Sequence, residues 1–122
     1  MTEKEKLDYW EKLGINVKAA MKYADDSMEF YEQLIGIFLK EYEQKRAKIA
    51  KEGKHSGQQY TVLVHGLKNS ARYLGADKLA DMALEHEKAS KAGNDSYIAE
   101  HLEALLEQWD ITVQQLGSKI DN

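Results

Sequence analysis

The chain has 122 residues with a formal net charge of −4; 43% of them are hydrophobic, and it has neither proline nor cysteine. One domain with a single core is expected over residues 1–122, and the absence of cysteine excludes disulfides and cysteine-ligated zinc. The negative net charge argues against general nucleic-acid binding. No apolar run approaches the ~20 residues of a membrane span, and the start resembles no signal peptide, so a cytoplasmic protein without membrane contact is expected.

The first half of the chain predicts two short helical segments followed by a long helix. Leu7, Trp10 and Leu13 form an amphipathic pattern that ends at Gly14, and a second short segment begins near Val17. Asp26-x-x-Glu29 is a variant of the capping box and predicts the start of the long helix. Its apolar stripe consists of Tyr31, Leu34, Ile35, Phe38, Tyr42 and Ile49.

Basic residues crowd the C-terminal end of this long helix. They are Lys45, Arg46, Lys48, Lys51 and Lys54. Cations at a helix C-terminus interact favourably with the helix dipole and with water, and this interpretation is preferred to a specific anion-binding role.

The segment from Gln58 to Leu74 predicts the most informative helix. At about 100° per residue, its apolar side chains fall within about 60° of Tyr60 and form one core-facing stripe. The stripe contains Tyr60, Leu63, Val64, Leu67, Ala71 and Leu74. His65 lies at about 140°, off the stripe and one turn from Lys68 and Asn69. Gly75 is suited to end the helix, because glycine adopts left-handed backbone angles at little cost.

The surface around His65 is locally cationic in an acidic protein. Residues 56–76 contain no Asp or Glu, where the overall composition would place about three or four. Small and apolar residues border the basic patch, as is typical of a protein-docking site. The expected docking residues are Val62, Gly66, Asn69, Arg72 and Tyr73.

Two further helices complete the predicted fold. One begins near Asp77, with the stripe Leu79, Met82, Ala83, His86 and Ser90, and a turn follows at Gly93-Asn94-Asp95. The last helix carries Ile98, Leu102, Leu105, Trp109, Val113, Leu116 and Ile120. Four long helices with short connections predict an all-α, antiparallel up-down four-helix bundle, with the short N-terminal helical segments covering one end.

The segment that begins at His65 resembles the signature of histidine-containing phosphotransfer (HPt) domains. His65-x-Leu67-Lys68 is followed by a small residue, Ser70, two positions after the lysine, and then by Gly75-Ala76. The resemblance covers about residues 15–120. It implies a phosphocarrier without an ATP site, not an enzyme, in which His65 takes a phosphoryl group from a receiver-domain aspartyl phosphate and passes it to another receiver. Lys68 would help to position the phosphoryl group.

The resemblance also implies the partners. Response-regulator receiver domains are expected to dock, a hybrid histidine kinase is a further candidate, and the chain itself is expected to be a monomer. No cofactor or metal is expected on this chain, since Mg²⁺ would belong to the receiver. The alternative is a helical-bundle interaction module that keeps the HPt scaffold but does not transfer phosphate. The presence of both His65 and Lys68 favours transfer over that alternative.

Two positions near the motif histidine leave questions open. Glu87 follows His65 by 22 residues, where HPt domains commonly carry Gln or Glu near the imidazole; a contact with the ring and a boundary position without a role are both retained. Asn69 stands where HPt domains usually have Gly. Its bulk could hinder a partner, whereas its amide could donate to a phosphoryl oxygen.

The other histidines are expected to have no part in transfer. His55 is placed in a solvated turn. His86 is placed on a core stripe and is expected to be a hydrogen-bonded core or boundary histidine, at a position where leucine should be tolerated. His101 lies near no other ligand-type histidine.

Overall fold

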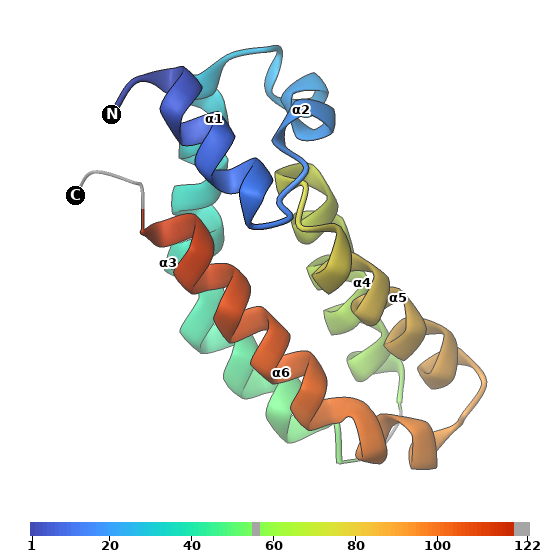
Figure 1. Ribbon diagram of the computed structural model, residues 1–122. Helices are drawn as coiled ribbons and strands as arrows, with labels where there is room; N and C mark the ends of the chain where they lie inside the picture. Colours follow the sequence, from blue (N-terminus) through green and yellow to red (C-terminus); the bar gives the residue numbers. More distant parts are fainter. Residues whose placement is uncertain (55–56, 119–122) are drawn as a thin grey trace.

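The computed structural model describes residues 1–54 and 57–118, and its regular structure is entirely helical (Figure 1). The elements are α1 (Glu3–Lys12), α2 (Val17–Ala20), the 3-10 helix η1 (Met21–Ala24), α3 (Met28–Glu52), α4 (Gln58–Leu74), α5 (Asp77–Lys91) and α6 (Asp95–Gly117). The predictions for His55 and Ile120 lie outside the described residues.

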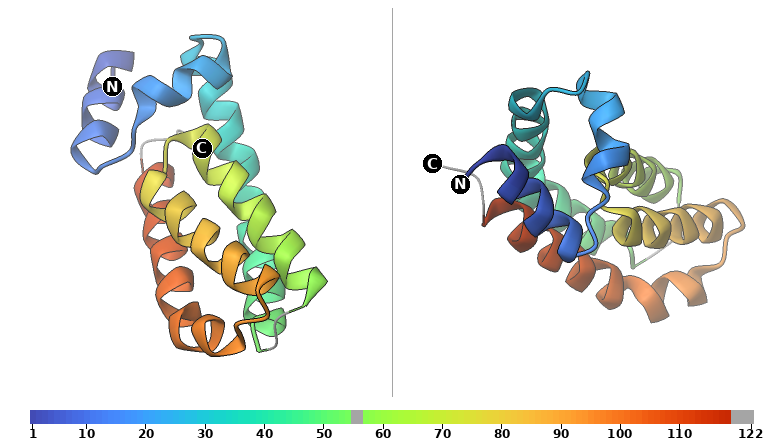
Figure 2. Two further views of the ribbon diagram at one scale, coloured as in Figure 1. Left: turned by 90° about the vertical axis from the view of Figure 1, so that its right-hand side faces the viewer. Right: turned by 45° about the horizontal axis from the view of Figure 1, so that its top comes forward.

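The four long helices form the predicted antiparallel bundle. Each packs on two neighbours, in the order α3, α4, α5, α6 and back to α3. Figures 1 and 2 show α1 and α2 gathered at one end of this bundle, beside the N-terminal end of α3 and the turn between α4 and α5. The buried interior draws on all of these elements and includes Trp10, Tyr31, Tyr60, Leu105 and Trp109. The expectation for the fold, including the covered end, is therefore confirmed.

The start of α3 differs from the prediction. Ser27, not Asp26, is the N-cap, and its hydroxyl oxygen accepts a hydrogen bond from the backbone N–H of Phe30 at 3.1 Å. Asp25 and Asp26 have positive φ angles of 55° and 57°, which aspartate tolerates better than most residues. They turn the chain out of η1, so the helix begins one residue later than it would with a cap at Asp26.

The connection between α4 and α5 is very short. Gly75 has a φ of 77°, and its carbonyl accepts a hydrogen bond from the backbone N–H of Asn16 at 2.8 Å. The α4–α5 hairpin is thereby tied to the N-terminal segment at the covered end. This turn also sets the register in which α5 runs back along α4.

The basic end of α3 is partly engaged within the bundle. The Arg46 guanidinium donates to both carboxylate oxygens of Asp110 on α6, at 2.7 and 2.9 Å, and the Tyr42 hydroxyl donates to the same carboxylate. The hydrogen bonds from Arg46 lower the pKa of Asp110 below its usual value. Lys45 pairs with Glu41 on its own helix at 2.5 Å. Arg46 and Lys45 are therefore engaged in ion pairs within the bundle.

His86 is buried, as predicted, and it is hydrogen bonded on both sides of its ring. Its Nε2 lies 3.2 Å from the backbone carbonyl of His101, and its Nδ1 lies 2.7 Å from the Tyr60 hydroxyl. A carbonyl only accepts, so the proton of the neutral ring is on Nε2, and Nδ1 accepts from Tyr60. One imidazole therefore links α4, α5 and α6.

These contacts argue against the expectation that leucine is tolerated at position 86. We expect His86→Leu to lower the free energy of unfolding by about 1–3 kcal/mol, because the Tyr60 hydroxyl and the His101 carbonyl lose their partner in a dry site. Urea unfolding followed by circular dichroism measures this difference. A variant as stable as the wild type would show that the two hydrogen bonds contribute nothing net.

Burial of His86 also predicts how stability depends on pH. Burial lowers the pKa of the His86 imidazole below its usual value of 6.5. Below about pH 6.5, His86 is therefore protonated in the unfolded chain but still neutral in the folded one. The free energy of unfolding should fall as the pH drops through this range. His86→Gln cannot titrate, so its stability should fall less between pH 7.5 and 5.5. Equal losses in both proteins would contradict this assignment.

Candidate functional site

His65 lies in the middle of α4 and faces away from the bundle core. Its side chain is 52% exposed, while Val64 and Leu67 on either side of it along the chain are buried. The position follows from the helical repeat, because the apolar stripe of α4 packs on the core and leaves His65 on the adjoining face. The motif histidine is thus accessible to a partner protein.

A buried carboxylate from α5 holds the inner nitrogen of this ring. The Nδ1 atom of His65 lies 2.5 Å from one oxygen of Glu87, whose side chain is only 4% exposed. The Lys68 ammonium donates to the other oxygen at 2.7 Å. Lys91, one turn further along α5, lies 3.6 Å from Glu87. The structure therefore brings His65, Lys68 and Glu87 together, and of the two positions considered for Glu87 it has the ring contact.

The charge of Glu87 is maintained despite its burial. Burial by itself would raise the pKa of this carboxyl, but hydrogen bonds from Lys68 and His65 outweigh it and hold the pKa below its usual value. A carboxylate accepts only, so the proton on Nδ1 of His65 points at Glu87. In a neutral ring, the outer nitrogen Nε2 then carries the free electron pair.

Asn69 and Lys68 lie close to the two nitrogens of the His65 ring, whereas Arg72 pairs with a residue of α5. The Asn69 amide nitrogen is 3.2 Å from Nε2 of His65. Arg72 reaches across to Asp81 on α5, at 3.9 Å. Lys68 lies 3.4 Å from Nδ1, so its ammonium is beside the inner nitrogen and not the outer one. The Lys68 side chain is only 15% exposed.

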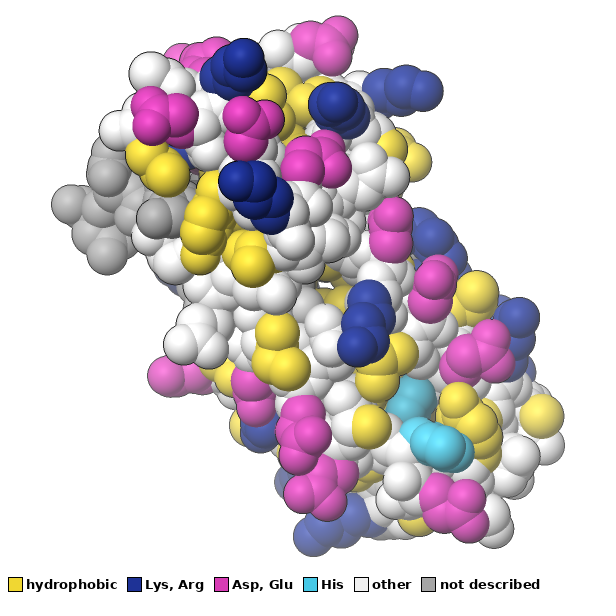
Figure 3. Space-filling view, in the orientation of Figure 1, with side chains coloured by type: hydrophobic (Ala, Val, Ile, Leu, Met, Phe, Trp, Pro, Cys, Tyr) yellow, Lys and Arg dark blue, Asp and Glu magenta, His cyan; other side chains and the backbone are white. Residues whose placement is uncertain are grey.

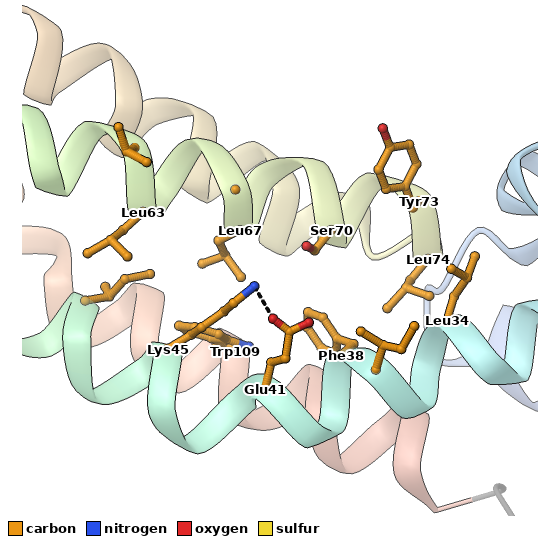
Figure 4. A pocket seen from close by; sticks show the side chains of 14 residues that line it. Leu34, Phe38, Glu41, Lys45, Leu63, Leu67, Ser70, Tyr73, Leu74 and Trp109 are labelled. Carbon is orange, nitrogen blue, oxygen red and sulfur yellow. Dashed lines mark ion pairs between the residues drawn. The ribbon is translucent and has the colours of Figure 1, made fainter.

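An apolar groove runs along the other side of α4, between α4 and α3. It has a volume of about 370 Å³, and Val62, Gly66 and Tyr73 of the predicted docking set line it. Figure 4 shows Leu34 and Phe38 of α3 facing Leu67 and Leu74 of α4 across this space. Because consecutive helical residues are about 100° apart, His65 and Gly66 place the ring and the groove on adjoining faces of α4.

The α3 wall of the groove was missing from the predicted docking set. Ile37 is 55% exposed and lines the same groove as the 66% exposed Val62. The signal in the sequence was an isoleucine just off the stripe of α3, next to Phe38. This isoleucine can be assigned to the groove only once α3 is known to lie beside α4, and the sequence alone does not give that arrangement.

Elsewhere the surface is more evenly charged. The face formed by α1, α5 and α6 in Figure 3 carries acidic and basic side chains intermixed, with hydrophobic side chains in small groups. Residues 1–54 and 57–118 contain no cluster of three or more His, Cys, Asp or Glu side chains placed to hold a metal ion. No helix in these ranges is long and apolar enough to cross a bilayer.

Comparison with known proteins agrees with this geometry. The model of the Hpt domain family matches residues 33–118, which is more than half of the chain and spans α4, α5, α6 and the bulk of α3. No match was found among curated proteins or among solved structures. The chain belongs to the Hpt domain family.

Membership in this family defines the class of function. Hpt domains are phosphocarrier modules of two-component phosphorelays, and they interact with the receiver domains of response regulators. The matched range contains the whole His65–Lys68–Glu87 cluster.

Proposed function

We propose that His65 is the phosphoryl-carrying residue of a phosphorelay, accepting a phosphoryl group from a receiver aspartyl phosphate and passing it to a second receiver. The observation that carries this proposal is the asymmetric setting of the ring. Its Nδ1 proton is held by a buried carboxylate, while Nε2 lies on the half-exposed side with its electron pair available.

The chemical step balances with the residues present. The Nε2 electron pair attacks phosphorus, the N–P bond forms, and the P–O bond to the aspartate breaks, with the electron pair leaving on the carboxylate. Nε2 has no proton to lose, so no base is needed for the attack. The ring gains positive charge while Nδ1 keeps its proton, and the Glu87 carboxylate at 2.5 Å offsets that charge. Return transfer reverses the step and releases a neutral imidazole.

Positioning and charge neutralisation supply the rest of the rate in phosphoryl transfer. Lys68 fixes Glu87 and adds positive charge beside the ring. The Mg²⁺ ion and the acidic pocket are assigned to the receiver, and this chain is assigned no cofactor. The acid-free surface of α4 suits an acidic partner.

The docking surface is assigned to the outer face of α4 together with the groove. Exposed apolar side chains at Ile37, Val62 and Tyr73 provide the contact area, and Arg72 provides charge at the edge. The partners are receiver domains, with a hybrid histidine kinase as one source of the phosphoryl group, and the chain acts as a monomer.

Incubation with a panel of phosphorylated receiver domains tests the proposal. Radiolabel should move to this chain and onto His65, and then onward to a second, unphosphorylated receiver. Receivers that bind without transferring label would instead support the non-transferring interaction module.

We expect Lys68→Ala to slow transfer roughly tenfold to a hundredfold, the size of one charge-assisted hydrogen bond. The variant should also lose about 1–3 kcal/mol of stability, because Glu87 would remain buried with one partner fewer. Single-turnover transfer measured at a temperature where the variant is fully folded separates the two effects. Lys68→Arg, which keeps the charge, should recover much of the rate. Unchanged transfer in Lys68→Ala would remove Lys68 from the site.

A further inference from the structure

Asn69 makes an unusual contact for a residue beside a nucleophile. Its amide nitrogen lies 3.2 Å from Nε2, the ring atom that must attack phosphorus. Asn69 is one helical turn after His65 and partly exposed, so its side chain can move without disturbing the core. This contact is independent of the Glu87 contact on the opposite edge of the ring.

The identity of the donor follows from the groups around the ring. Glu87 requires the Nδ1 proton, because a carboxylate has nothing to donate. Lys68 lies 3.4 Å from Nδ1 but 2.7 Å from Glu87, so its hydrogen bond belongs to the carboxylate. The neutral ring therefore presents an electron pair at Nε2, and the Asn69 amide can satisfy it only through an N–H.

We propose, building on His65 as the phosphoryl carrier, that Asn69 is a positioning residue whose amide N–H donates to Nε2 in the resting state and to a phosphoryl oxygen after transfer. The resting contact, with Glu87 on the other edge, holds the ring in one orientation. Without it, rotation of the ring by 180° about the Cβ–Cγ bond would exchange Nδ1 with Cδ2 and Nε2 with Cε1. Nδ1 would then leave Glu87, and Nε2 would leave its outward position.

The same contact changes role when the N–P bond forms. The Nε2 electron pair is then consumed, so the amide N–H has no acceptor left on the ring. Phosphoryl oxygens are strong acceptors and lie one bond further out, within reach of a small side-chain rotation. Asn69 thus restrains the free nucleophile and stabilises the phosphorylated product, where a glycine would do neither.

The first test observes the resting contact alone and needs no phosphoryl transfer. In a ¹⁵N spectrum of His65, loss of the hydrogen bond in Asn69→Ala should move the Nε2 resonance downfield relative to the wild type. Gln59→Ala removes an exposed amide from the same helix and should leave the resonance unchanged. An Nε2 resonance at the wild-type position in Asn69→Ala would overturn the proposal.

The second test measures the phosphorylated state with phosphoramidate as a small donor, so that no receiver is involved. The P–N bond of the donor breaks, ammonia leaves, and the phosphoryl group bonds to Nε2. Phosphorylated Asn69→Ala should hydrolyse roughly tenfold to a hundredfold faster than the wild type, the range for one hydrogen bond to a charged group. Equal lifetimes would overturn the role in the product.

Asn69→Asp keeps the shape of the side chain but replaces the donating amide with a carboxylate, which only accepts hydrogen bonds. A carboxylate can only accept, so it should draw a proton onto Nε2 and repel the phosphoryl group, slowing phosphorylation at least tenfold. Gln59→Glu makes the same charge change away from the ring and should have little effect. Asn69→Asp reacting at the wild-type rate would count against the proposal. A wild-type protein that takes no label would refute the proposed function instead, while the ¹⁵N result would still stand.

Discussion

His65→Gln should take up no phosphoryl label from any receiver or small donor, a loss of more than about a thousandfold, because the nucleophilic nitrogen has no substitute. The glutamine amide can still donate to Glu87, so the fold should survive. Transfer from a phosphorylated receiver, followed by electrophoresis and counting, measures the loss.

His101→Gln is the matched control for this experiment. His101 is also exposed, and its side chain lies beside Tyr97 on α6, with ring centroids 4.2 Å apart, rather than beside a carboxylate and a lysine. It should take up label at the wild-type rate. The wild-type label should be lost in acid and stable in alkali, as a phosphoramidate is. Label on His65→Gln, or label with the opposite stability, would contradict the assignment of His65.

Gly75→Ala should lower the free energy of unfolding by about 2–5 kcal/mol, the sum of left-handed strain and steric overlap. A Cβ atom there would lie 2.3 Å from the Asn16 carbonyl oxygen, which belongs to backbone and cannot swing away. The loss is a large part of the 5–15 kcal/mol typical of a domain. Chemical denaturation measures it.

Gly93→Ala separates the two causes of that loss. Gly93 also has a positive φ, 68°, but no atom lies within 4 Å of the position its Cβ would take. Only the conformational cost of about 1–2 kcal/mol should remain. If both variants lose the same amount, the close approach of Asn16 to Gly75 does not contribute.

The helix carrying the site could be predicted from the sequence almost to the residue. The expected range, Gln58 to Leu74, is the range of α4, because one clear apolar stripe is followed by a glycine with a positive φ. The predicted start of α3 was wrong, because three residues that can each cap a helix, Asp25 to Ser27, follow one another. Their different backbone angles depend on how η1 packs against α3, which no local pattern encodes.

The parts of the candidate site that lie on a single helix could be predicted, whereas the contacts between residues of different helices could not. His65, Lys68 and Asn69 follow from the motif. Glu87 could be placed only near the ring, because its rotation on α5 depends on the register set by the turn at Gly75. For the same reason, the hydrogen-bond partners of His86 were not foreseen: one is a side chain of α4 and the other a carbonyl of α6.

The position of α4 between two different neighbours has an evolutionary consequence. On one side, α5 supplies the carboxylate that governs the reactivity of the ring. On the other, α3 supplies the apolar wall whose exposed member is Ile37. With receivers docking in the groove as proposed, mutations on α3 would change which partner binds while the surroundings of the His65 ring stay the same. A duplicated copy of this gene could diverge to a new partner through a few changes on one helix, without first losing its chemistry.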